Sequence, residues 1–291
     1  MTAILDAPTQ LQVDGFAPGV HQMDAETYHA QRDVLSSSGA RLLINPSCPA
    51  KFRWAMDNPQ PPKKTFDYGT AAHRMVLGDG PELVLVDAKL WNTDKIRAEV
   101  AAIRAEGNVP LKRDEMQMVK DMAAAIRQHP VASKLFDPDS GKPEQSLFWQ
   151  DKATGVQCRA RLDWLRHADG GRLICPDYKS AADASTKAFN WAVQDYRYHQ
   201  QAEFYKDGIR ALGLAEDVPF LFVVQEKSAP YLINIIELDP LWLLMAVDRN
   251  KRARETFARC METGEWAGYP NEIQMVSPPA WLETEHEREY S

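Results

Sequence analysis

The sequence predicts a mixed α/β fold of the α+β kind, in which helices flank a central mixed β-sheet. Two observations support this prediction. Apolar residues recur at helical spacing through most of the first half of the chain, whereas short apolar or alternating runs lie at 146–179 and 219–238. At 291 residues, with 44% hydrophobic and 26% charged residues, the chain is long enough to form one large globular domain.

The first part of the chain is expected to be helical. Residues 1–22 contain several Pro and Gly residues and no clear period, which predicts an irregular N-terminal arm. A domain of residues 23–268 is expected to follow. Its first half should contain a short strand at 83–87 and helices at 36–44, 47–56, 68–77, 94–106 and 112–128.

The second part alternates between strands and helices. The runs 146–150 and 156–165 flank a turn at 151–155, which predicts a hairpin. A third strand at 172–179 should extend it into an antiparallel meander. One long helix at 186–212, strands at 219–226 and 231–238, and a helix at 241–265 are expected next. Residues 269–291 should form a tail that is mobile or docks on a partner.

Bulk properties limit the possible functions. The net charge of −7 argues against a broad basic coat for nucleic acid, but it allows a local channel. No apolar run approaches the ~20 residues of a membrane helix, and the N-terminus lacks the pattern of a secretory signal, so we expect a cytoplasmic protein without a membrane partner. The cysteines lack metal-site spacing and are expected to be reduced thiols; they are Cys48, Cys158, Cys175 and Cys260.

Three charged residues interrupt the apolar strands. Asp163 lies between Leu162 and Trp164, and the stretch LICPDYK contains Asp177 and Lys179. Two carboxylates on neighbouring strands repel each other unless a cation lies between them, and Mg²⁺ or Mn²⁺ suits such oxygen ligands. Lys179 should share a strand face with Asp177. It could orient or help to deprotonate an attacking water, or stabilise charge on a phosphate.

Each of these residues also has a structural interpretation. Asp177 and Lys179 alone could be a neighbouring ion pair at a sheet edge, and Glu144 could equally be a solvated loop acid or a member of the site. A single helical histidine such as His73 is usually a packing residue. Arg161 could meet phosphates or lie on a solvated strand face. The tryptophans at 54, 149, 164 and 191 are expected in the core.

Taken together, these residues resemble the core of the PD-(D/E)-x-K nucleases. Pro176, Asp177 and Lys179 match the terminal motif, and Asp163 precedes it by fourteen residues. The stretch GTAAHRMVLG around His73 resembles the helical histidine motif of the RecB-like branch.

Two further motifs narrow the resemblance. In YHQQAEFY, Gln201 and Tyr205 resemble the Q-x-x-x-Y motif of that branch, although Gln194 and Tyr198 also fit its spacing. Residues 36–52 resemble the start of the exonuclease VIII (RecE) nuclease domain. We prefer Gln201 and Tyr205 because the family motif usually lies further from the lysine. If 186–212 is one helix, all four side chains share one face.

The resemblance implies roles for these positions. His73, Asp163, Asp177 and the backbone carbonyl of Tyr178 would bind the catalytic Mg²⁺, or Mn²⁺ in its place. Lys179 would act on the attacking water, with Glu144 as a further candidate catalytic acid. Gln201, Tyr205 and Arg161 would support the site or touch DNA. Some RecB-like nucleases hold an iron–sulfur cluster on four cysteines, three of them near the C-terminus. Only Cys260 lies there in this chain, so no cluster is expected.

The implied activity is metal-dependent exonuclease digestion of linear double-stranded DNA from the 5′ end. It would leave 3′ single strands for a phage-type annealing partner of the RecT kind. The resemblance also implies a homo-oligomeric ring of three or four subunits. The alternatives are a Cas4-like single-strand or structure-specific nuclease, and a catalytically inert DNA-binding or assembly module with the nuclease fold.

Overall fold

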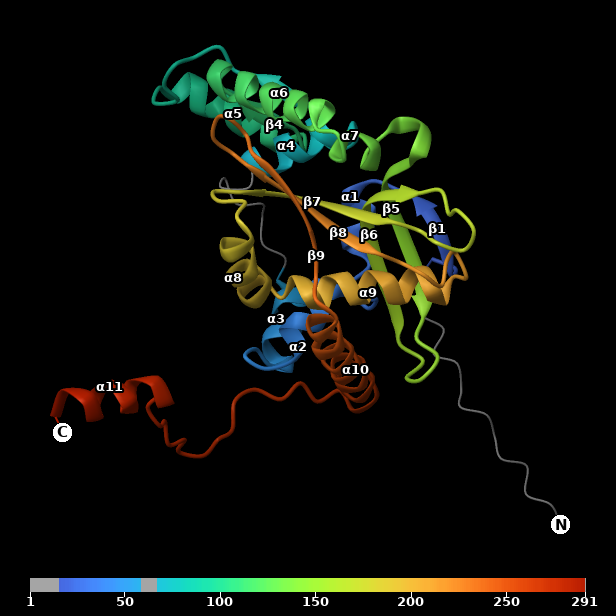
Figure 1. Cartoon of the computed structure of the whole chain (residues 1–291), viewed down its shortest axis with the longest axis vertical. Coiled ribbons are helices and arrows are strands. Elements are labelled where there is room, and N and C mark those ends of the chain that lie inside the picture. Colours follow the sequence, from blue (N-terminus) through green and yellow to red (C-terminus); the bar gives the residue numbers. More distant parts are fainter. Residues whose placement is uncertain (1–15, 59–66, 291) are drawn as a thin grey trace.

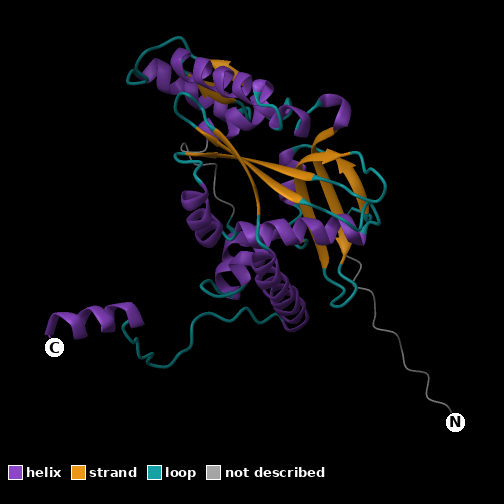
Figure 2. Cartoon of the chain, viewed as in Figure 1, coloured by secondary structure: helices purple, strands orange, loops and turns teal. Residues whose placement is uncertain are grey.

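A computed structural model describes residues 16–58 and 67–290 of the protein (Figure 1). Most of the strands occupy the middle of the molecule, with one group of helices from residues 67–128 at one end and a second group from residues 37–57 and 240–263 at the other (Figures 1 and 2). The mixed α/β fold predicted from the sequence is confirmed.

The strands form three sheets. The largest has the order β1-β5-β6-β2, the second β7-β8-β9, and a short pair consists of β3 and β4. The strand bounds are β1 Gly19–Gln22, β2 Leu35–Ser36, β3 Leu83–Leu85, β4 Val109–Leu111, β5 Gly141–Gln150, β6 Gln157–Arg166, β7 Cys175–Ala181, β8 Phe220–Glu226 and β9 Ile233–Glu237.

Helices surround these sheets. Their bounds are α1 Ala25–Ala30, α2 Ser37–Leu43, α3 Pro49–Asp57, α4 Asp67–Leu77, α5 Asp94–Ala105, α6 Arg113–Gln128, α7 Ala132–Leu135, α8 Thr186–Tyr196, α9 Tyr198–Ala211, α10 Pro240–Thr263 and α11 Ala280–Tyr290, with a 3₁₀ turn at Pro138–Ser140.

The predicted hairpin is confirmed as β5 and β6, which pair antiparallel. Asp151 organises the turn, because its carboxylate accepts the Thr154 N–H at 2.9 Å and its carbonyl accepts the Gly155 N–H at 2.8 Å. Helix α9 crosses this hairpin so closely that a Cβ on Gly208 would come within 2.8 Å of the Trp149 ring. Only glycine fits there, so the close approach of α9 to the hairpin depends on Gly208.

The predicted antiparallel meander is wrong at its third strand. β7 pairs in parallel with β8, from Cys175 opposite Phe220 to Ala181 opposite Glu226, and β8 then pairs antiparallel with β9. Helices α8 and α9 connect β7 to β8, as a parallel pair requires. The apolar run in β7 is therefore explained by burial under helices on both faces of a sheet rather than by hairpin pairing with β6.

The predicted helix at 186–212 is also interrupted. Arg197 has the left-handed conformation, with φ 56° and ψ 42°, and its N–H closes the last turn of α8 on the Val193 carbonyl. The chain therefore changes direction between α8 and α9. As a consequence, Gln194 and Tyr198 belong to two different helices and do not share one continuous face with Gln201.

Two further predictions fail in detail. Residues 19–22, which we expected in an irregular arm, form β1 at the edge of the main sheet, where Gly19 pairs with Phe148. Trp54 and Trp191 are exposed by 59% each rather than buried, whereas Trp149 and Trp164 lie in the core as expected.

After α10 the chain first packs on α3, where Trp266 stacks on Phe52 and the Ala267 carbonyl accepts the Ala50 N–H at 3.0 Å. It then runs away from the body of the protein and ends in α11, which is exposed along its length (Figure 1). Whether it docks on a partner stays a prediction. Over the described ranges, none of the helices combines the length and the apolar character needed to cross a bilayer.

Candidate active site

The site forms where β6 and β7 lie next to each other but belong to different sheets. Instead of a backbone ladder at this point, the Asp163 carboxylate on β6 accepts the Tyr178 N–H of β7 through Oδ2 at 2.7 Å. The side chain of Tyr178 donates to Gln225 Oε1 at 2.7 Å. Asp163 thus interrupts the predicted alternation because it links two sheets.

Asp177 is the most buried acid of the site, with 1% of its side chain exposed. Its Oδ1 accepts a hydrogen bond of 2.8 Å from Gln201 Nε2 on α9. Its Oδ2 forms an ion pair with Lys179 Nζ at 2.5 Å. The ammonium of Lys179 also lies 5.3 Å from the centre of the Tyr198 ring. The structure therefore brings Asp177 and Lys179 to one face of β7, as their spacing predicts.

His73 on α4 connects two carboxylates. Its Nδ1 lies 3.1 Å from Glu144 Oε1, and its Nε2 lies 3.2 Å from Asp163 Oδ2. Burial alone lowers the pKa of His73, but the two carboxylates outweigh that effect and raise it to about 10. Because both ring nitrogens face carboxylate oxygens, the raised pKa favours the imidazolium form, which pairs with Glu144 and Asp163 at once.

Glu144 is a member of the site and not a solvated loop acid. It lies inside β5 between Pro143 and Gln145, which pair with Trp164 and Leu162, so it is opposite Asp163. Its φ of 51° is left-handed, an unusual conformation that costs a non-glycine residue on the order of 1–3 kcal/mol. In this conformation the Glu144 carboxylate lies between His73 and Arg161 and forms an ion pair with each of them.

Arg161 holds the far side of the Glu144 carboxylate. Its Nε donates to Glu144 Oε2 and its Nη1 donates to the Met23 carbonyl at 3.0 Å. Only 14% of its side chain is exposed. Arg161 is therefore a buried partner of a site acid and does not lie on the solvated face of the strand.

The two aspartates differ in electrostatics. Burial raises the pKa of Asp177 to about 7; Lys179 opposes this rise, and the charge of Asp163 adds to it. Burial also acts to raise the pKa of Asp163, but His73 and Lys179 reverse the effect and lower it. Burial acts to lower the pKa of Lys179, yet Asp177 and Asp163 raise it, so its ammonium is retained. Asp163 and Asp177 together thus carry negative charge that His73 and Lys179 neutralise only in part.

These donors fit a hard divalent cation. Within the described ranges, no three His, Cys, Asp or Glu side chains already surround a common point as a closed metal cage does. However, Asp177 has a raised pKa because its charge is buried and only partly compensated. Carboxylate oxygens on two neighbouring strands are the ligands that Mg²⁺ and Mn²⁺ prefer. His73 could join them only after losing the proton that it shares with the carboxylates.

A cavity of about 370 Å³ lies beside His73, Glu144 and Arg161. Sequence reasoning missed several polar residues that line it, among them His29 on α1 and Thr70 and Arg74 on α4. The last two lie within one turn of His73, and this proximity was the signal that could have identified them.

One residue from each of the two possible Q-x-x-x-Y pairs lies at the site. Gln201 comes from one pair and contacts Asp177, whereas Tyr198 comes from the other and lies beneath Lys179. Gln194 is exposed. Tyr205 packs against Phe220, with ring centres 6.1 Å apart, on the same helix as Gln201.

Replacing Gln201 with alanine is expected to weaken the binding of a divalent cation by about 10- to 100-fold, because Asp177 loses the hydrogen bond that orients it. Gln194→Ala is the matched control, since the Gln194 side chain is exposed on α8. Calorimetric titration of the two purified variants with Mn²⁺ provides the measurement. Equal affinities for both would contradict the assignment of Gln201.

Solved structures support the fold. The chain is similar to the crystal structure of a protein named "Putative exonuclease" from Eubacterium rectale, with 13% identity, a TM-score of 0.58, and coverage of 91% of this chain and 98% of that one. It also matches the structure of SSO0001 at 10% identity over 76% of each chain, but the TM-score of 0.31 is too low to support an argument.

A family model identifies the family to which the chain belongs. The model for a PDDEXK-like domain of unknown function (DUF3799) matches residues 36–279, which include His73, Glu144, Asp163, Asp177, Lys179 and Gln201. The chain therefore belongs to this family of PDDEXK-like domains.

Proposed function

We propose that the protein is a metal-dependent exonuclease that hydrolyses linear double-stranded DNA. The observation that carries the proposal is the placement of Asp163 and Asp177 on adjacent strands, with Lys179 paired to the second acid at 2.5 Å. An inert module with this fold has no need for a buried acid whose pKa is raised. The intact Asp163, Asp177 and Lys179 thus favour an enzyme.

Mg²⁺, or Mn²⁺ in its place, would be held by Asp163, Asp177, the backbone carbonyl of Tyr178 and a deprotonated His73. When bound, it would supply positive charge and Lewis acidity at the scissile phosphate. Everything else in the site comes from the chain. Gln201 fixes the orientation of Asp177, and Arg161 fixes that of Glu144.

Lys179 is the residue that acts at the reacting groups. Because its pKa is raised, it is a poor acceptor for a proton at neutral pH. Its ammonium, with 21% of the side chain exposed, is instead suited to orient the attacking water and to balance the negative charge that develops on the phosphate. Of the roles considered from the sequence, the raised pKa favours these two.

We further propose 5′ to 3′ digestion that leaves 3′ single strands for an annealing protein of the RecT kind, and a homo-oligomeric ring around the DNA. A ring would reconcile the net charge of −7 with binding of DNA, because the acidic residues could face outward.

The test uses linear duplexes labelled at the 5′ or the 3′ end, incubated with the full-length protein and Mg²⁺ or EDTA. We expect early release of the 5′ label with Mg²⁺ and no release with EDTA. Early release of the 3′ label would reverse the polarity, and attack on single strands or branched DNA alone would favour the Cas4-like alternative. Intact DNA in the presence of Mg²⁺ and Mn²⁺ would favour the inert module.

A further inference from the structure

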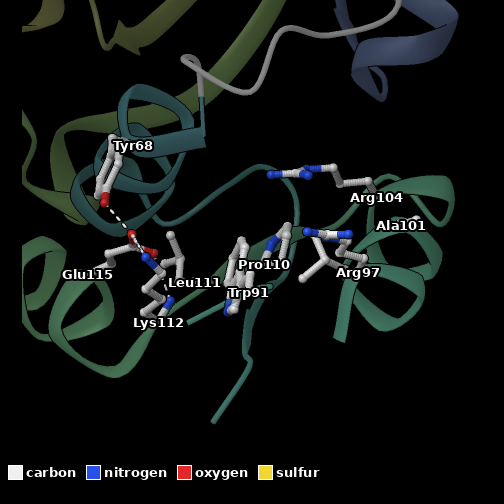
Figure 3. A pocket seen from close by; sticks show the side chains of 10 residues that line it. Tyr68, Trp91, Arg97, Ala101, Arg104, Pro110, Leu111, Lys112 and Glu115 are labelled. Carbon is white, nitrogen blue, oxygen red and sulfur yellow. Dashed lines mark hydrogen bonds and ion pairs between the residues drawn. The ribbon is translucent and has the colours of Figure 1, made fainter. Parts of the chain in front are cut away.

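A second cavity lies outside the catalytic centre, among α4, α5, β4 and α6 (Figure 3). Its volume is about 590 Å³, within the range of ~300–1,000 Å³ that is common for small-molecule sites. Part of its wall is apolar and comes from Val100, Ala101, Pro110 and Leu111. It is therefore large enough for more than a single inorganic anion.

Positive charge dominates the polar part of the wall. Arg97, Arg104 and Lys112 line the cavity, and Glu115 is the one acid among the described residues that line it. The Glu115 carboxylate is already used inside the protein. Its Oε1 accepts from the Tyr68 hydroxyl, and its Oε2 accepts from the Lys112 N–H at 2.8 Å (Figure 3). Glu115 thus caps α6 and leaves an excess of positive charge facing the cavity.

Two of these cations, Arg97 and Lys112, form only weak ion pairs within the protein. Arg97 contacts Asp94 at 3.4 Å, but this pair lies at the surface, with 63% of the arginine and all of the aspartate side chain exposed. Such a pair contributes little and is easily exchanged for another anion. The ammonium of Lys112 is 3.9 Å from Glu115 and 5.6 Å from the centre of the Trp91 ring. Both side chains are able to bind a phosphate.

Trp91 gives the cavity an aromatic surface beside these cations. In Figure 3 its ring lies next to Pro110, between Lys112 on one side and Arg97 on the other. Indole rings stack on nucleobases without regard to sequence, and cations beside them bind the adjoining phosphates. A planar aromatic group and basic side chains at the edge of one apolar cavity match the chemistry of a nucleotide.

We propose that this cavity binds a nucleotide unit of single-stranded DNA, with the base against Trp91 and the flanking phosphates at Lys112 on one side of the ring and at Arg97 on the other. Helix α4 connects it to the catalytic centre, because Tyr68 lines this cavity and His73 lines the other. The two residues are five positions apart, which corresponds to ~7.5 Å along the helix axis. The inference rests on the proposed nuclease function, since it gives the cavity the task of holding a strand next to the catalytic cavity.

The test measures binding and needs no cleavage. A fluorescently labelled twelve-residue oligothymidylate is titrated with the full-length protein in EDTA, and binding is followed by anisotropy at several salt concentrations. The double variant Arg97→Ala/Lys112→Ala is expected to bind about 10-fold more weakly, and the slope of log K against log salt should fall by about 1. The control is Arg113→Ala/Lys120→Ala, which removes equal charge from α6 at residues outside the lining of the cavity.

A second pair of variants tests the aromatic surface. Trp91→Ala is expected to weaken binding by about 10-fold, whereas Trp91→Phe retains a stacking surface and should restore most of the affinity. Thermal melting of each variant establishes that the fold is intact. Competition by thymidine monophosphate, but not by inorganic phosphate at the same concentration, is expected if the base contributes.

The outcomes separate this inference from the proposed function. Equal loss of affinity in the test and control doubles, or no loss in either, would overturn the nucleotide site even if the protein degrades DNA. Absence of oligonucleotide binding by the unaltered protein would overturn it as well. Selective loss in the test double, from a protein that leaves every DNA intact with Mg²⁺, would support the cavity and refute the nuclease.

Discussion

Replacing Asp177 with asparagine is expected to abolish Mg²⁺-dependent DNA degradation, with a fall in rate of ~10³-fold or more. Asparagine keeps the size of the side chain and can still accept the hydrogen bond from Gln201, but it lacks the charge that a divalent cation requires. Degradation of labelled duplex over a range of enzyme concentrations measures the effect. Retention of a tenth of the original rate would contradict the role given to Asp177.

The same variant has a distinctive effect on stability. Because burial raises the pKa of Asp177 to about 7, the ionised carboxylate opposes folding at pH 8 in the absence of metal. The Asp177→Asn variant should therefore melt at the same temperature as the unaltered protein or at a higher one in EDTA. Addition of Mg²⁺ should raise the melting temperature of the unaltered protein only. A large drop in melting temperature in EDTA would show that the loss of activity reflects unfolding.

Replacing Lys179 with methionine is expected to lower the rate by about 10²- to 10⁴-fold. Methionine preserves much of the aliphatic side chain over the Tyr198 ring but removes the ammonium that pairs with Asp177. The metal ligands remain, and Asp177 loses a competing cation. The melting temperature of this variant should thus still rise with Mg²⁺, at the same or a lower Mg²⁺ concentration.

The two variants together distinguish metal binding from catalysis. Asp177→Asn should lose both the Mg²⁺-induced shift and the activity, whereas Lys179→Met should lose the activity alone. If Lys179→Met also lost the shift, Lys179 would be a structural partner of the carboxylates. If it kept full activity, the lysine would have no part in the reaction.

The sequence alone predicted the hairpin, most of the helices and the residues that meet at the site. These predictions succeed because they rest on local rules. Alternation and turn residues define β5 and β6, and helical periodicity defines α4 and α6. A charged residue in an apolar strand can be recognised whichever strand that strand pairs with. Asp163 and Asp177 interrupt their local patterns, whereas His73 was identified through the family resemblance, and the structure brings the three together.

Other features depended on the tertiary structure. The pairing of β7 with β8 rather than β6 involves strands about forty residues apart, and no local pattern specifies such a partner. The break at Arg197 needs a left-handed residue that propensity would place inside a helix. That break determines that Gln201 reaches Asp177 while Tyr198, from the other possible motif, lies beneath Lys179.

Glu144 shows most clearly the difference between what the sequence predicts and what the tertiary structure decides. From the sequence, Glu144 fits a loop acid and a site acid equally well, because an acid before a predicted strand is compatible with both. The structure places it opposite Asp163 in a strained conformation, between His73 and Arg161. The sequence determined which residues are candidates for the site, since side-chain type and spacing are local. The fold decided which of them meet, because burial and strain arise only when distant segments pack together.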